Sequence, residues 1–302
     1  MWFKNLLVYR FTKPFSLSAE ELDEQLAQKP FMPCGSQDMI TSGWVAPIGL
    51  PDAPLVHANG GCLMVCLQRQ QKVLPASVVN EVLAEKVEEI KEAEDRAVGR
   101  KERQELKDQI IFELLPRAFS RTGKLYAYID TAQQLLIINA SSPNRADELV
   151  SVLRETIGTV PVIPLRSPRA PTAAMTEWLQ SGSGPAEFAL GGECELRDKA
   201  DETAVIRCKN QDLQSPEIKS HLDSGMLASK LELIWDGGIE CLVDSHLAVK
   251  RLRFGDLIMD KVGDVHAESA AEQFDVDFTI MTGELARFLP ALADAFGGIE
   301  TE

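Results

Sequence analysis

The chain has 302 residues, of which 45% are hydrophobic and 25% are charged, and its formal net charge is −15 at pH 7. These fractions are those of an ordinary globular protein, and the length favours two domains or one large domain with insertions. No stretch approaches the ~20 consecutive apolar residues of a membrane-spanning helix. The N-terminal segment also lacks a signal-peptide layout, so we expect a cytoplasmic protein.

Cysteine and histidine spacing argues against a metal site. The six cysteines contain no C-x-x-C pair, and the four histidines contain no H-x-x-x-H pair. Common zinc motifs are therefore excluded, and we expect neither a metal nor another cofactor. Cys62 and Cys66 share one face of an apolar segment and are expected to be small buried hydrophobes.

The first 75 residues predict strands with one short helix. Residues 2–11 have the pattern of a strand, and Ser18 to Glu21 form a capping box that begins a helix reaching about Ala27. The turn-rich segment 33–38 is either a packed surface loop or a binding loop. A buried strand is expected over 62–68, emerging at Arg69 and Lys72.

Residues 75–113 have helical periodicity. Apolar side chains at Val79, Leu83 and Val87 share one face, and Gly99 indicates a turn before a second helix with Ile110 in its apolar stripe. Glu and Lys occupy the remaining positions. We expect two charged helices that form an antiparallel hairpin projecting from the main body.

The segment from Leu114 to Arg121 follows this hairpin. Pro116 should end or kink the helix. If the next residues are extended, Arg117, Phe119 and Arg121 share a face. Two guanidinium groups beside one aromatic ring suit a nucleic-acid backbone, with phosphates on the cations and the ring free to wedge or stack. On local pattern alone, a buried Phe119 with solvated arginines is the simpler interpretation.

The remaining pattern predicts an α+β fold. Strands at 124–130 and 134–140, a helix at 144–157 and an edge strand at 160–164 indicate an antiparallel sheet with helices on one face. The proline-rich segment 165–171 is the best candidate linker. The elements expected after it are a helix at 173–180, a loop at 182–192, strands at 193–198 and 203–209, a helix after Ser215, strands at 227–235, 239–244 and 248–254, and acidic helical segments over 256–298.

These elements divide the chain into three parts. The N-terminal α+β domain comprises 1–75 and 124–165, the charged hairpin comprises 76–123, and a C-terminal α+β domain with an acidic tail comprises 166–302. Charge is segregated among them: residues 256–302 hold 11 acidic and 2 basic side chains, whereas residues 96–124 hold 8 basic and 4 acidic. Because exposed charges are screened beyond about 8–10 Å, an acidic protein can still present a basic patch to phosphates.

Familiar catalytic motifs are missing from the sequence. Thr122, Gly123 and Lys124 resemble the end of a phosphate loop, but position 118 is Ala where that loop needs Gly. Asp256, Asp260 and Asp264 recur every four residues and could line a helix as in metal-dependent nucleases, although a solvated acidic helix is the simpler interpretation. We therefore expect a binding protein and not an enzyme.

Six landmarks in matching order give the chain a family resemblance. They are Trp2–Leu6, Pro33–Met39, Leu114–Arg121, Thr176–Trp178, Lys209 with Gln211–Leu213, and Met281–Leu285. Together they resemble the bacterial RdgC family of recombination-associated proteins over essentially the whole chain.

The resemblance implies a non-enzymatic, nucleoid-associated protein that binds DNA. It implies a closed, ring-shaped homodimer with a basic central hole, which binds duplex DNA without marked sequence preference and also binds single strands. Such a protein restrains RecA-dependent recombination and replication-fork repair by occupying DNA that RecA would coat.

The resemblance also implies which residues contact DNA. They are Arg117 and Phe119 with Arg121 beside them, and a second patch at Lys209 and Gln211. Position 210 is Asn here, where relatives can have a second lysine, so that patch has one charge fewer. The further basic residues that the sequence offers are Arg100, Lys101 and Arg103 on the hairpin, and Lys250, Arg251 and Arg253 on the last strand.

Two alternatives from other functional classes remain open. One is a metal-dependent DNA-processing enzyme that uses the carboxylates of 256–275. The other is an interaction scaffold whose acidic tail binds basic partner proteins.

Overall fold

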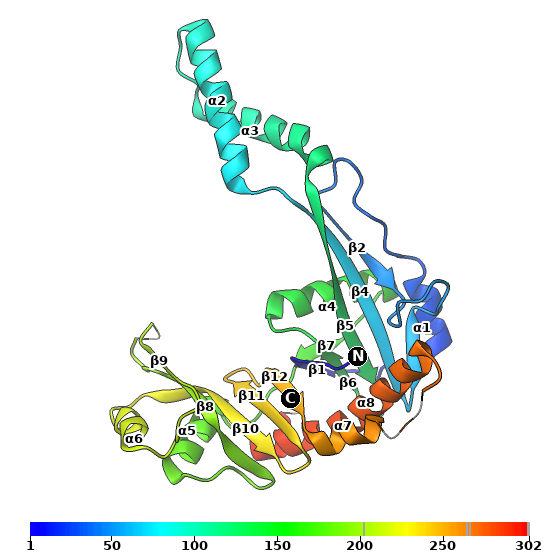
Figure 1. Cartoon of the computed structure of the whole chain (residues 1–302), viewed down its shortest axis with the longest axis vertical. Coiled ribbons are helices and arrows are strands. Elements are labelled where there is room, and N and C mark those ends of the chain that lie inside the picture. The colour runs from blue at the N-terminus through cyan, green and yellow to red at the C-terminus, as the bar shows by residue number, and fades with distance from the viewer. Residues whose placement is uncertain (202, 264, 266, 301–302) are drawn as a thin grey trace.

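Two antiparallel sheets and eight α-helices make up the described residues, and Figure 1 shows their arrangement. The computed structural model describes residues 1–201, 203–263, 265 and 267–300. No helix in these ranges is long and apolar enough to cross a membrane. The predicted α+β class with antiparallel sheets is confirmed.

The first sheet contains seven strands in the order β2-β4-β5-β6-β1-β7, with β3 also paired to β4. The strands are β1 (Leu7–Phe11), β2 (Ile40–Val45), β3 (Val56–Asn59), β4 (Cys62–Val73), β5 (Phe119–Asp130), β6 (Leu135–Ile138) and β7 (Val162–Pro164). Strands β4 and β5 pair over twelve positions, from Cys62 opposite Asp130 to Val73 opposite Phe119. Both are longer than predicted, because their polar ends continue the ladder beyond the apolar run that marks a buried strand.

Helices contact both faces of this sheet. Residues Cys62 to Leu67 are all buried. Leu63 packs beneath α1 (Ala19–Leu26) and α4 (Pro143–Ile157), whereas Met64 and Tyr128, on the opposite face, pack with Phe278 of α8 (Ala270–Ala295). The expectation of helices on one face was therefore wrong for this sheet. A continuous apolar run, in contrast to an alternating one, needs cover on both sides.

The second sheet has the order β12-β11-β10-β8-β9. Its strands are β8 (Phe188–Arg197), β9 (Val205–Cys208), β10 (Leu227–Trp235), β11 (Ile239–Asp244) and β12 (Val249–Phe254). Strand β8 begins inside the segment 182–192 that was expected to be a loop. A Cβ at Gly191 would lie 2.5 Å from Cγ of Glu232, and the β8–β10 pairing shifts register nearby. The glycines therefore mark an irregular strand with a close neighbour.

Helix α8 joins the two sheets into one core. Near its start, Phe278 contacts Tyr128 of β5, and farther along Phe288 contacts Trp235 of β10. A continuous buried cluster consequently includes residues of both sheets. The backbone bridge between Leu6 and Val249 adds a second connection. The division into three parts stays an interpretation of the sequence.

The remaining helices are α5 (Pro171–Ser181), α6 (Pro216–Asp223), α7 (Asp256–Gly263), α2 (Ala76–Glu94) and α3 (Arg100–Leu114). Helices α2 and α3 lie at one end of an arched molecule, beyond β4 and β5 (Figure 1). Val79, Leu83 and Ile110 form a small buried cluster between them. The two helices are thus held by their own contacts at the end of the β4–β5 pair, which β2 accompanies as far as Gln71.

Candidate nucleic-acid interface

The connection from α3 to β5 is a short 3-10 turn. Helix α3 ends at Leu114, and the turn η1 (Leu115–Arg117) contains Pro116. Proline ends the helix here because it has no N–H to donate and its ring disfavours helical backbone before it. Extended backbone begins at Ala118 (φ −69°, ψ 139°). Strand alternation therefore places Phe119 and Arg121 on one face, but it does not extend to Arg117, which lies in the turn.

Phe119 is the most exposed large apolar side chain of this region, with 86% of its surface accessible. It lies opposite Val73, which is itself 46% exposed, at the last pair of the β4–β5 ladder. The simpler local interpretation of a buried Phe119 was wrong. The reason is that the strand runs beyond the sheet's core, where no helix covers this pair of positions.

Basic residues are frequent in the strand ends around Phe119. Residues 68–73 and 117–124, which we call the ribbon end, contain five basic and no acidic residues: Arg69, Lys72, Arg117, Arg121 and Lys124. Arg69 pairs with Glu148, whereas the other four make no ion pair with any residue that the structure describes. The ribbon end therefore carries a net positive charge on an acidic protein.

The sequence analysis did not predict that Lys72 and Lys124 belong to the ribbon end. Lys72 is opposite Ser120 and Lys124 is opposite Gln68 in the ladder. The two strand ends are separated by the whole of α2 and α3 in the chain. Strand register brings both lysines into the ribbon end, and strand alternation places them on the face opposite Phe119 and Arg121; no local pattern contains that information.

The loop at 33–38 packs along the same ribbon. The Cys34 N–H donates to Oε1 of Gln70 at 2.7 Å, and the Lys72 N–H donates to the carbonyl of Met39 at 2.9 Å. This loop is consequently a packed element that supports the ribbon end.

The second predicted patch lies in the turn after β9. Lys209 and Gln211 are both exposed. The Nζ of Lys209 is 4.0 Å from Oε1 of Glu193, and Arg251 donates to the same carboxylate at 2.6 and 2.8 Å. The hydrogen bonds from Arg251 hold the pKa of Glu193 below its usual range. The Glu193 carboxylate, whose lowered pKa favours its charged form, thus offsets part of the positive charge of Lys209.

Asn210 has a conformational role in this turn. Its φ is 51°, in the left-handed region that Asn tolerates better than most residues. The next residue, Gln211, donates its N–H to the carbonyl of Gly192 at 3.2 Å. The turn therefore favours Asn at position 210, which gives a physical reason for the missing second lysine.

The two patches lie in different parts of the chain. Figure 1 shows the start of β5 beside α3 and the tip of β9 at the other end of the arch. The structure brings Phe119 and Arg121 together on one strand face, with Arg117 in the adjoining turn, but it does not bring Lys209 and Gln211 to them. Among the weaker candidates, Lys101 is almost fully exposed, whereas Lys250 pairs with Asp244.

Comparison with known proteins gives the family. The family model described as "Putative exonuclease, RdgC" matches residues 1–299. The chain belongs to the RdgC family. Curated proteins named "Recombination-associated protein RdgC" are 45% identical in Aeromonas hydrophila subsp. hydrophila (99% of each chain), 45% in Pseudomonas fluorescens (100% of this chain, 99% of the relative) and 41% in Tolumonas auensis (all of both chains).

The predicted family is therefore confirmed, and a role associated with recombination is supported for this RdgC chain. The printed descriptions differ on activity. The family model names an exonuclease, whereas the curated relatives are named for recombination. Neither description assigns a role to any individual residue of this chain.

The carboxylates considered for an RdgC nuclease lie on two helices. Asp256 and Asp260 are on α7, and Asp264 lies outside the described residues. Asp275 on α8 accepts two hydrogen bonds from Asn59 at 2.9 Å and lies 3.0 Å from Nε2 of His57. Within the described ranges, no group of three or more His, Cys, Asp or Glu could hold a metal ion.

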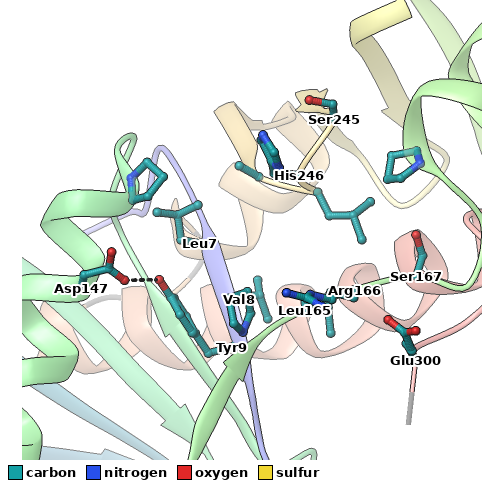
Figure 2. Close-up of a pocket in the computed structure, with 15 residues that line it drawn as sticks. Leu7, Val8, Tyr9, Asp147, Leu165, Arg166, Ser167, Ser245, His246 and Glu300 are labelled. Atoms are coloured by element: carbon teal, nitrogen blue, oxygen red, sulfur yellow. Dashed lines mark hydrogen bonds between the residues drawn. The ribbon is translucent and has the colours of Figure 1, made fainter. Parts of the chain in front are cut away.

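A recess of about 430 Å³ separates the first sheet from the β11–β12 turn (Figure 2). Its walls are largely apolar, with Leu7 and Leu165 among them. The hydroxyl of Tyr9 donates to Asp147 at 3.3 Å, and burial, with the charge of Asp147 added, raises the pKa of Tyr9 to about 12. None of the DNA-contact residues predicted for this RdgC chain lines the recess.

Proposed function

We propose that this RdgC-family protein binds DNA through the ribbon end without marked sequence preference. One observation carries the proposal: Phe119, 86% exposed, stands between Arg117 and Arg121, and neither cation is neutralised by a described residue. Guanidinium groups bind phosphates, which every nucleotide has, and a ring can stack on any base. These contacts hold a strand without reading its sequence.

The proposal includes duplex and single-stranded DNA as ligands. Phosphate contacts from Arg117 and Arg121 serve both forms, and Lys72 and Lys124 add positive charge on the other face of the ribbon end. In single strands the bases are open to Phe119, whereas in a duplex the ring presses on sugars or wedges at a base step. Lys209 and Gln211 form a second, weaker contact, because Glu193 offsets part of the charge of Lys209.

We further propose that two copies form a closed ring around DNA. The arched chain (Figure 1) is a shape that two copies can close, and its formal charge of −15 disfavours DNA on the outer surface. Inward basic groups would then confine the duplex to the central hole. A cytoplasmic, nucleoid-associated ring of this kind restrains RecA-dependent recombination by occupying DNA, without an enzymatic step.

Binding of labelled duplex and single-stranded DNA across a salt series, with and without magnesium, tests the proposal. Retarded DNA with a steep salt dependence and intact strands is the expected result. Cutting of the DNA that depends on magnesium would show that the protein is a nuclease. If no DNA is bound at low salt, the remaining hypothesis is a scaffold whose acidic tail binds basic partner proteins. Molar mass in solution tests the ring separately, since a ring requires a multiple of the 33.3 kDa chain.

A further inference from the structure

Three arginines gather around a recess on one face of the ribbon end. The recess has a volume of about 340 Å³ and is lined by Arg69 and Gln71 of β4, Arg121 and Gly123 of β5, and Arg145 of α4. Arg145 lies in the first turn of its helix, which adds the positive end of the helix dipole. Three elements far apart in the chain thus supply one basic concavity.

Strand register explains why these side chains share the recess. Gln71 is opposite Arg121, and Arg69 is opposite Gly123. Residues directly opposite in an antiparallel pair point to the same face. A few positions farther along, Leu67 and Leu125 on this face pack in the core beneath α4. The recess is therefore the open continuation of the groove between the ribbon and α4.

Gly123 keeps the floor of the recess empty. A Cβ built at this position would meet no atom within 4 Å. Its φ lies outside the left-handed region, so the backbone does not itself demand glycine. The absence of a side chain opposite Arg69 therefore leaves space that a ligand can enter.

The charge of the recess is only partly compensated. Glu148 accepts from Nη1 of Arg69 at 3.3 Å and from Nη1 of Arg145 at 3.0 Å, so one carboxylate serves two guanidinium groups. Arg121 makes no ion pair with any described residue. Three guanidinium groups against one carboxylate leave an excess of two positive charges.

One of the donor atoms of Arg69 also lacks an acceptor. Its Nη2 donates to Oε1 of Gln71 at 3.1 Å, but its Nε is buried and has no hydrogen-bond partner among the described residues. A buried N–H without an acceptor is unfavourable, and such groups in native proteins usually have a partner. An anion with several acceptor oxygens that enters the recess would offset the excess charge.

We propose that this recess binds a phosphate group. The source is either a backbone phosphate of the nucleic acid beside Phe119 or a free polyphosphate, since both offer the same acceptor oxygens. The first source rests on the proposed DNA-binding function and extends the contact track from Arg121 to Arg145. Arginine suits this ligand because its planar fork donates two parallel hydrogen bonds.

Two variants address the recess in different ways. Gly123→Val fills the floor with a side chain that strands favour and leaves the charge unchanged, whereas Arg145→Gln removes charge and leaves the space. Arg154→Gln is the matched control, because Arg154 is exposed on the same helix and does not line the recess. Circular dichroism and thermal midpoints confirm that each variant folds.

Titration with inorganic tripolyphosphate in a calorimeter is the first measurement. We expect each variant to weaken binding about tenfold, since Arg145→Gln removes a charge-assisted contact and Gly123→Val fills the space that the anion would occupy. Arg154→Gln should bind as the wild type. Equal affinity of the wild type and both recess variants for tripolyphosphate, together with unchanged DNA binding in the salt series, would overturn the inference.

The DNA salt series distinguishes the two sources. If a backbone phosphate occupies the recess, Arg145→Gln and Gly123→Val each lower the slope of log affinity against log salt by about 0.7–0.9. If the ligand is a free polyphosphate, both slopes stay unchanged while tripolyphosphate binding is lost. A wild type that binds tripolyphosphate in the recess but no DNA would refute the proposed function and support this inference through its second source.

Discussion

Phe119 and Val73 are directly opposite each other at the last pair of the β4–β5 ladder, and both side chains are exposed. A single exposed apolar residue is common on protein surfaces and needs no explanation. This pair differs because the chain around it is basic and contains no acidic residue from 117 to 124. An apolar tip on a positive ribbon suits a ligand with aromatic bases and a charged backbone.

Replacement of the ring tests its part in binding. Phe119→Ala should weaken DNA binding by about 1–3 kcal/mol, the usual contribution of base–aromatic stacking. The salt slope should stay nearly constant because no charge is removed. Thermal stability should also be unchanged, since the ring is 86% exposed and buries little surface. Gel-shift titrations and a melting curve measure the three quantities.

Phe112→Ala is the matched control for this change. Phe112 lies on α3 and is 59% exposed, so its removal makes a similar chemical change outside the ribbon end. It should leave DNA affinity as in the wild type. Unchanged affinity in Phe119→Ala would remove Phe119 from the site, and equal losses in both variants would place the contact on a broader apolar surface.

Removal of a cation gives a different signature. Arg117→Gln and Arg121→Gln should each flatten the salt slope for duplex DNA by about 0.9, because each lost phosphate contact releases one fewer counterion equivalent. Lys219→Gln on α6 changes the net charge equally but lies outside both patches, so its slope should match the wild type. A uniform change in all three variants would show that net charge, and not position, governs binding.

Local sequence signals predicted local structure well. The capping box at Ser18 is present with both bonds: the Glu21 N–H donates to Oγ of Ser18 at 3.1 Å, and the Ser18 N–H donates to Oε2 of Glu21 at 2.8 Å. Pro116 ends α3 within two residues of its position. Each of these outcomes depends on neighbours in the chain, so the sequence contains the needed information.

Contacts between distant segments could not be predicted in the same way. The recess joins Arg69, Arg121 and Arg145, and Glu193 approaches both Lys209 and Arg251. The identities of these partners depend on strand register, which a single sequence does not specify outside the apolar runs. The exposure of Phe119 was not predicted for the same reason, since no local sequence pattern shows that β4 and β5 extend beyond the buried core.

The Glu193 contact predicts that the second patch is partly masked. Glu193→Gln should strengthen DNA binding at low salt, because Lys209 and Arg251 lose the carboxylate between them. Lys209→Ala should have a larger effect in the Glu193→Gln background than alone, and a double-mutant cycle measures the difference. Identical losses from Lys209→Ala in both backgrounds would show that Glu193 does not mask Lys209.

A buried carboxylate on the second sheet predicts a stability effect that depends on pH. Glu195 of β8 is 4% exposed and accepts hydrogen bonds from Ser229 at 3.0 Å, Lys230 at 2.8 Å and Arg207 at 2.8 Å. Burial by itself raises the pKa of Glu195, but these bonds outweigh it and hold the pKa at about 2. Glu195→Gln should cost about 1.5–3 kcal/mol at neutral pH, the range for hydrogen bonds to charged groups.

The sign of the pH dependence follows from the lowered pKa. An unfolded glutamate has a pKa of about 4.3, so between that value and about 2 the unfolded chain binds a proton that the folded chain does not. The stabilisation by Glu195 is therefore complete above the unfolded pKa and is lost as the pH falls toward the folded pKa. Urea unfolding from pH 7 to pH 3 should show the gap between wild type and Glu195→Gln narrowing. Glu24→Gln, an exposed substitution on α1, should show no comparable trend, and a constant gap for Glu195→Gln would contradict a charged, hydrogen-bonded Glu195.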